Sequence, residues 1–248
     1  MDPQQLSTHL EELRRRVFRG FIAVAIATIA AFAFAPLLFR WLLRPYHTFA
    51  RVGTAMEDGV MLQTLQPAET LKMSVQLALV VGIGVVLPYL LYETWSFVRP
   101  GLTTKERRWL APVLGGGTLL FCIGVIFAYY AVLPVALHFF WDYSLRLGIT
   151  PAWSAAYYIG FVLSTLGAFG LAFELPLVML LLAAVGLITS ATLRSKRRYA
   201  YFIIAMLAAL LTPPDALSMV LMGIPLIGLY ELSVQLTRMV KPRSATPP

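Results

Sequence analysis

The chain has 248 residues, of which 59% are hydrophobic and only 13% are charged, and its mean hydropathy is +0.76. This composition excludes a soluble globular domain and indicates an all-α polytopic membrane protein. The polar stretches are too short to form a core of their own, so residues 1–248 are predicted to be one transmembrane domain. The single cysteine, Cys122, excludes an intramolecular disulfide.

Six apolar stretches are predicted to cross the membrane as helices. The first follows three arginines and resembles a signal peptide, but it is too long for one, so we treat it as a membrane span. The fifth is short for a hydrocarbon core of about 30 Å, which implies local thinning of the bilayer or a partner helix beside it. The intervening segments, including residues 40–68 and 134–153, are expected to be loops. The predicted spans are residues 17–39, 71–92, 109–133, 157–187, 199–211 and 216–236, followed by a disordered tail at 237–248.

The basic residues predict the orientation of these spans. Lysine and arginine gather before the first span, in the loops after the second and fourth spans, and in the tail. Because basic residues favour the cytoplasmic side, both termini are expected to be cytoplasmic. The opposite side carries fewer of them: Arg40, Arg44, Arg51, Lys72 and Arg146.

Glu174 is the one carboxylate in the fourth predicted span. A carboxylate at mid-depth costs roughly 2.5–3.5 kcal/mol, so it is expected to face a partner, a water-filled cavity or the bundle interior. Pro176 lacks a backbone donor and should kink the helix, freeing a carbonyl nearby. Glu174 is therefore either a polar functional site or a protonated side chain that this carbonyl or a neighbouring helix satisfies.

Two further carboxylates, Glu12 and Glu106, are predicted at the cytoplasmic face. Together they could receive a basic peptide, with arginine preferred over lysine because guanidinium–carboxylate pairs can be bidentate. Each also has a local explanation. Glu12 can pair with Arg16 one turn later, after a capping box that starts a helix at Thr8, and Glu106 can close a capping box that opens the third span.

The chain lacks the Walker A, G-x-S-x-G and H-E-x-x-H motifs, so it is not expected to be an enzyme. Its histidines, His9, His47 and His138, lie in separate segments and indicate no metal site. Asp215 ends a T-P-P-D sequence, which is typical of a helix start. Two other functions remain open on these grounds: a proton-coupled transporter of small solutes that uses Glu174 as carrier, and a purely structural scaffold.

Five segments of the chain, in order, resemble the TatC family, the multi-spanning core subunit of the twin-arginine protein translocase. The similarity runs from the first span to the last, and no single motif carries it. The segments are HLEELRRR (9–16), FVRPGLTTKERR (97–108), GVIFAYYAVLPVALHFF (124–140), FGLAFELPLV (169–178) and LLTPPDALSMVLMGIPLIGLYE (210–231).

The resemblance implies six helices curved into a cupped shape, with short fifth and sixth helices. It implies a receptor in the inner membrane of a prokaryote that binds twin-arginine signal peptides at its cytoplasmic face. With TatA- and TatB-type single-span partners, such a receptor exports folded proteins using the proton-motive force. The resemblance further implies contact with lipid and self-association within the complex, and neither a cofactor nor a nucleic-acid partner.

The resemblance also assigns roles to residues. Glu12 and Arg14 match the functional residues of an N-terminal H-L-x-E-L-R motif. Phe97 and Glu106 match residues of the first cytoplasmic loop. These four residues are therefore expected to bind the signal peptide.

Three other positions match residues within or beyond the membrane. Glu174 matches an intramembrane glutamate that faces the concave side, Pro45 a proline after the first span, and Asp215 the aspartate of the T-P-P-D turn. The short fifth helix resembles the edge where a partner helix packs. Many members carry glutamine where this chain has Met219, which leaves Thr212 to make a polar contact with that partner.

Overall fold

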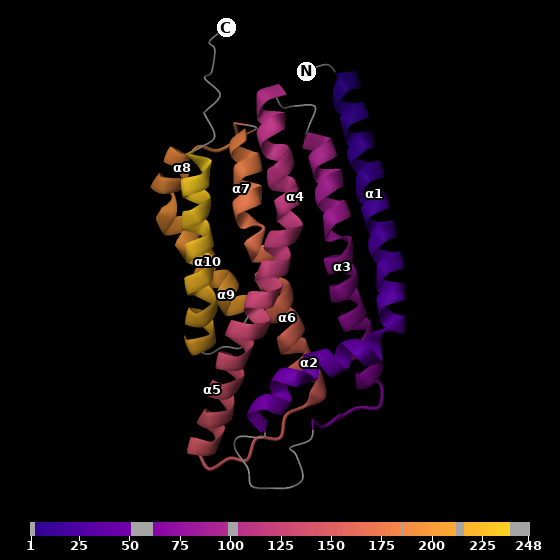
Figure 1. The fold of residues 1–248 in the computed structure, drawn as a ribbon, viewed down its shortest axis with the longest axis vertical. Coiled ribbons are helices and arrows are strands. Elements are labelled where there is room, and N and C mark those ends of the chain that lie inside the picture. Colours follow the sequence, from indigo (N-terminus) through magenta and orange to yellow (C-terminus); the bar gives the residue numbers. More distant parts are fainter. Residues whose placement is uncertain (1–2, 51–61, 99–103, 185, 212–215, 239–248) are drawn as a thin grey trace.

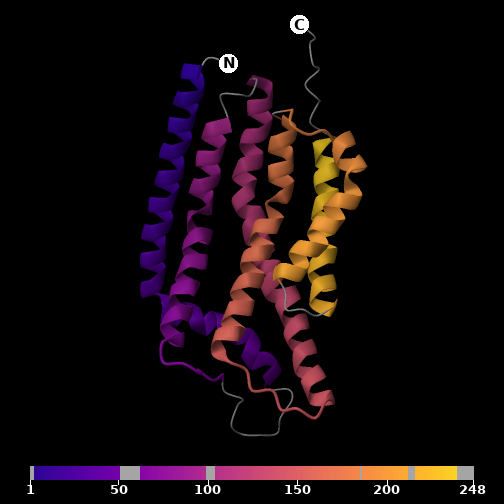
Figure 2. The same cartoon turned by 180° about the vertical axis from the view of Figure 1, so that it is seen from behind.

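The computed structural model describes residues 3–50, 62–98, 104–184, 186–211 and 216–238. Within these ranges the secondary structure is helical apart from one isolated bridge between Gln63 and Ser154. The helices stand side by side, with α1 at one edge and the α9–α10 pair at the other (Figures 1 and 2). The start of α1 and the end of α10 lie at the same end of the bundle, which we call the termini end (Figure 1).

The first pass is α1 (Pro3–Ala33), and it is followed by a separate helix, α2 (Ala35–Ala50). Two predictions are wrong here, because α1 begins before the capping box at Thr8 and the expected loop at 40–68 is helical as far as Ala50. The break between the helices has a local cause, since Pro36 cannot donate to the carbonyl one turn earlier. The helix α2 then turns across the opposite end of the bundle (Figure 1).

The second pass is α3 (Glu69–Val98), which packs along α1. The two helices approach closely at Gly82, where a Cβ atom would lie 2.6 Å from Thr28 Oγ1. Only a residue without a side chain fits this contact, so Gly82 sets the distance between the helices.

The third pass combines α4 (Thr104–Phe127), a π-helical turn (Ala128–Val132) and α5 (Leu133–Arg146). The sequence predicted a loop from residue 134, but the helix continues for three more turns. Pro134 occupies the first turn of α5, where the missing N–H costs no regular hydrogen bond. The π-helical turn absorbs the change in bonding register, and the prolonged pass carries Trp141 into the core.

The fourth pass is interrupted, as Pro176 predicts. The helix α6 (Ala155–Phe173) ends at Glu174, and α7 (Leu175–Ala184) continues beyond it. The N–H of Glu174 bonds to Leu171 O at 3.1 Å, in a tightened last turn. The junction of α6 and α7 lies near mid-height of the bundle (Figure 1).

The chain ends in α8 (Ser190–Ser195), α9 (Arg197–Leu211) and α10 (Ala216–Thr237). Five passes in the described residues are long and apolar enough to cross a membrane, whereas the 15 residues of α9 are fewer than such a span needs. The short helix α8 replaces part of an expected loop, and Thr189 caps it by accepting a hydrogen bond from Thr192 N. The tail beyond Arg238 lies outside the described residues.

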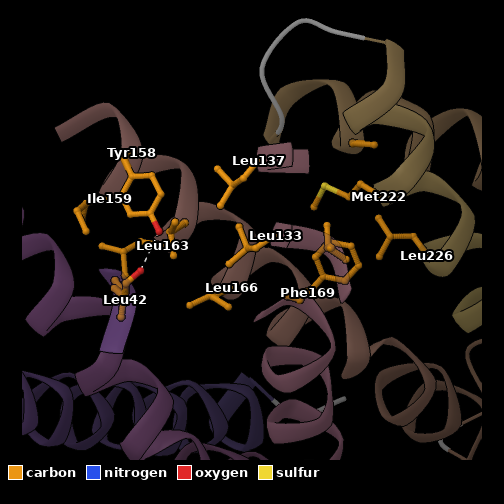
Figure 3. Packing of buried hydrophobic residues seen from close by; sticks show 14 of the residues in the cluster. Leu42, Leu133, Leu137, Tyr158, Ile159, Leu163, Leu166, Phe169, Met222 and Leu226 are labelled. Atoms are coloured by element: carbon orange, nitrogen blue, oxygen red, sulfur yellow. Dashed lines mark hydrogen bonds between the residues drawn. The ribbon is translucent and has the colours of Figure 1, made fainter. Parts of the chain in front are cut away.

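The main core lies where α5, α6 and α10 meet. Leu133, Phe169 and Met222 come from these three helices and are almost fully buried (Figure 3). The hydroxyl of Tyr158 donates to Leu42 O at 2.9 Å and thereby ties α2 to α6 (Figure 3). The packing of these buried side chains holds α5, α6 and α10 together, and the hydrogen bond of Tyr158 holds α2 against α6.

Candidate functional site

The termini end carries the first group of predicted site residues. Glu12 and Arg14 are exposed on α1, and Phe97 is half-buried in the last turn of α3. Glu106 lies in the first turn of α4, but its side chain lies outside the described ones. The three helices reach the same end of the bundle (Figure 1). The fold therefore brings the segments that carry these four residues to the termini end of the bundle.

Arg16 connects the predicted site to a residue that the sequence did not indicate. Its Nε and Nη2 atoms donate to Glu12 Oε1, which confirms the alternative that these two residues pair along one helix. Its Nη1 atom donates to Glu93 Oε2 on α3 at 2.8 Å. The hydroxyl of Tyr89 donates to the other oxygen of Glu93, Oε1, also at 2.8 Å. The two carboxylates and the guanidinium thus form a chain of charge-assisted hydrogen bonds from α1 to α3.

An open cavity of about 540 Å³ lies beside this chain of charges. The described residues that line it are Glu11, Glu12, Arg14, Arg15 and Phe18. The side chain of Glu12 is 44% exposed, whereas that of Arg16 is only 18% exposed. Glu12 therefore presents a carboxylate to the solvent in a cavity that Phe18 also lines. This combination suits a ligand that carries both a guanidinium group and apolar side chains.

Glu174 is buried in the middle of the bundle, with only 6% of its surface exposed. Neither carboxyl oxygen has a hydrogen-bond partner among the described residues. A Cβ atom at Gly117 would lie 3.1 Å from Glu174 Oε2, 2.7 Å from Leu177 Cδ2 and 2.8 Å from Leu91 Cδ1. The carboxyl group thus lies against α4 among leucine side chains, and no freed carbonyl in the described part of the chain satisfies it. A buried polar group without a partner is costly, so Glu174 is available to a polar ligand or helix.

The remaining predicted residues are dispersed. Pro45 is buried within α2 at the opposite end of the bundle. Met219 is half-buried and packs against the main core. Thr212 and Asp215 lie outside the described residues. The structure therefore brings together the segments of the four residues predicted to bind the signal peptide, and it places Glu174 and Pro45 apart from them.

A second ionic cluster, also missed by the sequence analysis, joins α9 to α10. Arg197 Nη2 donates to Glu231 Oε2, and the hydroxyl of Tyr201 donates to Glu231 Oε1 at 2.6 Å. The spacing of Arg197 and Tyr201, like that of Tyr89 and Glu93, places both on one helix face. Their partner on the neighbouring helix depends on tertiary register, which no spacing within one segment reveals.

Comparisons with known proteins find close relatives over nearly the whole chain. The family model described as Sec-independent protein translocase protein (TatC) matches residues 8–225. The chain is 39% identical over 235 residues to the Sec-independent protein translocase protein TatC of Aquifex aeolicus, covering 94% of this chain and 95% of that one. It is 37% identical over 237 residues to the protein of the same description from Deinococcus radiodurans, covering 95% and 86%.

A solved structure is also similar. The crystal structure of the twin arginine translocase receptor TatC matches with a TM-score of 0.82 at 39% identity, covering 94% of this chain and 99% of that chain. The predicted fold class, an all-α polytopic membrane protein with six spans in a cupped arrangement, is thereby confirmed.

Proposed function

The chain belongs to the TatC family of Sec-independent protein translocase proteins, and we propose that it is the receptor subunit that binds twin-arginine signal peptides. This family is a membrane component of a protein translocase, so the prediction that the chain is not an enzyme is confirmed. The carrier of small solutes and the inert scaffold, left open by the residues alone, give way to a protein-transport role.

The observation that carries the proposal is the exposed carboxylate of Glu12 beside an open cavity at the termini end. One arginine of the signal pairs with Glu12 on α1, and the second pairs with Glu106 at the start of α4. Each pair can form two parallel N–H···O bonds, which a lysine ammonium cannot reproduce. Arg14 and Phe97 border the same face, where Phe97 offers an apolar surface to the residues that follow the arginine pair.

Glu174 supplies the second functional feature. The hydrophobic part of the signal lies along the concave face of the bundle, and Glu174 offers a polar group there to a partner helix or to water. Its lack of a hydrogen-bond partner within the described residues supports this role. Pro45 and Asp215 shape the periplasmic side, and Thr212 contacts a partner helix at the short α9 edge.

The proposed setting follows from this role. The subunit lies in the inner membrane of a prokaryote with both termini in the cytoplasm, in agreement with the basic residues at the termini end. TatA- and TatB-type subunits and further copies of the chain complete the complex, which exports folded proteins with energy from the proton-motive force. No cofactor takes part.

Binding of a fluorescent twin-arginine signal peptide to the purified protein in lipid nanodiscs tests the proposal. Glu12→Gln and Glu106→Gln should each raise the Kd about 10- to 100-fold, because each removes a charge-assisted hydrogen bond. A twin-lysine peptide should bind weakly and lose less affinity in the variants. Asp142→Asn is the matched control, because it removes one exposed carboxylate at the opposite end of the bundle. Equal losses for both peptides would argue against specific arginine recognition.

A further inference from the structure

The chain's own Arg16 occupies the carboxylate that the signal peptide needs. Two of its guanidinium nitrogens donate to Glu12 Oε1, while the third donates to Glu93 Oε2 and to the backbone oxygen of Glu93. A signal arginine carries the same guanidinium group, so it must compete with Arg16 for Glu12. The affinity of the site therefore depends on how firmly Arg16 holds Glu12.

Glu93 is the residue placed to decide that competition. Its side chain is 12% exposed, and that of Arg16 is 18% exposed, so this pair is more protected from solvent than the pair that Arg16 makes with Glu12. Tyr89, one turn earlier on α3, donates to Glu93 and fixes the orientation of its carboxylate. A sheltered and oriented partner attracts a guanidinium more strongly than an exposed one.

We propose that Glu93 is a positioning residue of the signal-peptide site, which retains Arg16 on α3 when a signal arginine takes Glu12. This inference rests on the proposed function. In the bound state two guanidinium groups face two carboxylates, with Arg16 on Glu93 and the signal arginine on Glu12. Without Glu93, Arg16 keeps only Glu12 as its carboxylate partner among these groups, and it becomes a stronger intramolecular competitor.

Three variants in nanodiscs test the proposal through the Kd of the twin-arginine peptide. Glu93→Gln keeps the side-chain shape but loses the charge, and it should raise the Kd about fivefold. Arg16→Gln removes the competitor and should lower the Kd about threefold. The double variant Arg16→Gln/Glu93→Gln should match Arg16→Gln, with a Kd about threefold below that of the unmodified protein, since no competitor remains for Glu93 to hold. These factors are typical of partly exposed ion pairs.

Two controls separate positioning from other effects. Glu231→Gln breaks the corresponding Arg–Glu–Tyr cluster between α9 and α10, so it reports the effect of a lost interhelical ion pair on fold alone. Arg146→Gln/Glu93→Gln has the same net charge as the rescued double variant, but it leaves Arg16 in place and changes an exposed residue at the end of α5 instead, so its Kd should stay raised. Thermal unfolding of each variant shows whether the protein remains folded.

The outcomes distinguish this inference from the function on which it rests. An unchanged Kd in Glu93→Gln, a raised Kd in Arg16→Gln, or no rescue in Arg16→Gln/Glu93→Gln would overturn the positioning role. Should Glu93→Gln fail to fold, the Kd of Arg16→Gln alone tests the competition. Loss of a purely structural arginine would weaken peptide binding, whereas loss of a competitor would strengthen it. If Glu12→Gln also leaves the Kd unchanged, the receptor function itself fails.

Discussion

Gly124 on α4 should tolerate no larger residue, because it lies directly against the backbone of Phe169 and the side chain of Phe173 on α6. A Cβ atom at this position would lie 2.6 Å from the backbone oxygen of Phe169 and 2.9 Å from Phe173 Cγ. The oxygen belongs to a helix and cannot rotate away, so the helices must separate. Overpacking of this kind costs about 3 kcal/mol, while alanine gains about 1 kcal/mol over glycine in helix propensity. The net expectation for Gly124→Ala is a loss of about 2 kcal/mol in the free energy of unfolding.

Gly116, two turns earlier on the same helix, is the matched control. A Cβ atom there meets nothing within 4 Å. Gly116→Ala should therefore stabilise the protein by about 0.5–1 kcal/mol through helix propensity alone. Unfolding by SDS in mixed micelles, followed by helical circular dichroism, measures both changes. Equal effects of the two substitutions, or a stable Gly124→Ala, would refute the close contact between α4 and α6.

Three further predictions concern the core and the buried carboxyl group. Phe169→Ala should lower the free energy of unfolding by about 3–5 kcal/mol in the same SDS titration, because a fully buried ring at the junction of three helices is lost. Tyr158→Phe should cost only about 1 kcal/mol, the value of its hydrogen bond to Leu42 O, and should make α2 more accessible to limited proteolysis. Glu174→Leu should stabilise the protein by about 1 kcal/mol or more, since the unpartnered carboxyl group lies among leucines, yet export of a twin-arginine passenger by membrane vesicles should fall. A Glu174→Leu protein that is less stable, or that exports normally, would contradict the role assigned to this carboxyl group.

The membrane passes could be predicted from the sequence because apolar length is a local property. The errors fall at prolines, whose effect depends on where each one meets the helix. Pro176 does interrupt its helix, as predicted, whereas the helix break before Pro36 lies inside the predicted span 17–39 and was not expected. Pro134, in contrast, lies in the first turn of α5 and ends nothing, so the expected loop is helical to Arg146. The sequence offered no sign of the π-helical turn that makes this continuation possible.

In the candidate site, too, some features could be predicted from the sequence and others could not. The exposed carboxylate of Glu12 and its pairing with Arg16 follow from spacing along one helix, and both were predicted. Glu93 was placed in a loop by the sequence analysis, because its partner lies 77 residues away on α1 and only the register of α1 against α3 reveals it. The lack of a hydrogen-bond partner for Glu174 among the described residues likewise depends on tertiary packing, which brings Leu91 of α3 and Gly117 of α4 close to it. Interactions within a helix were thus predictable, and those between helices were not.

Site-specific photocrosslinking tests the central claim most directly. A photoreactive residue would be introduced into the full chain at Glu106, and in a second variant at Leu13, beside Glu12. Both variants would be studied in membranes that contain the partner subunits. The receptor account predicts crosslinks from both positions to a twin-arginine signal peptide, and their loss when the two arginines of the peptide become lysines. Crosslinks that persist with lysines, or none from either position while the protein is folded, would contradict it.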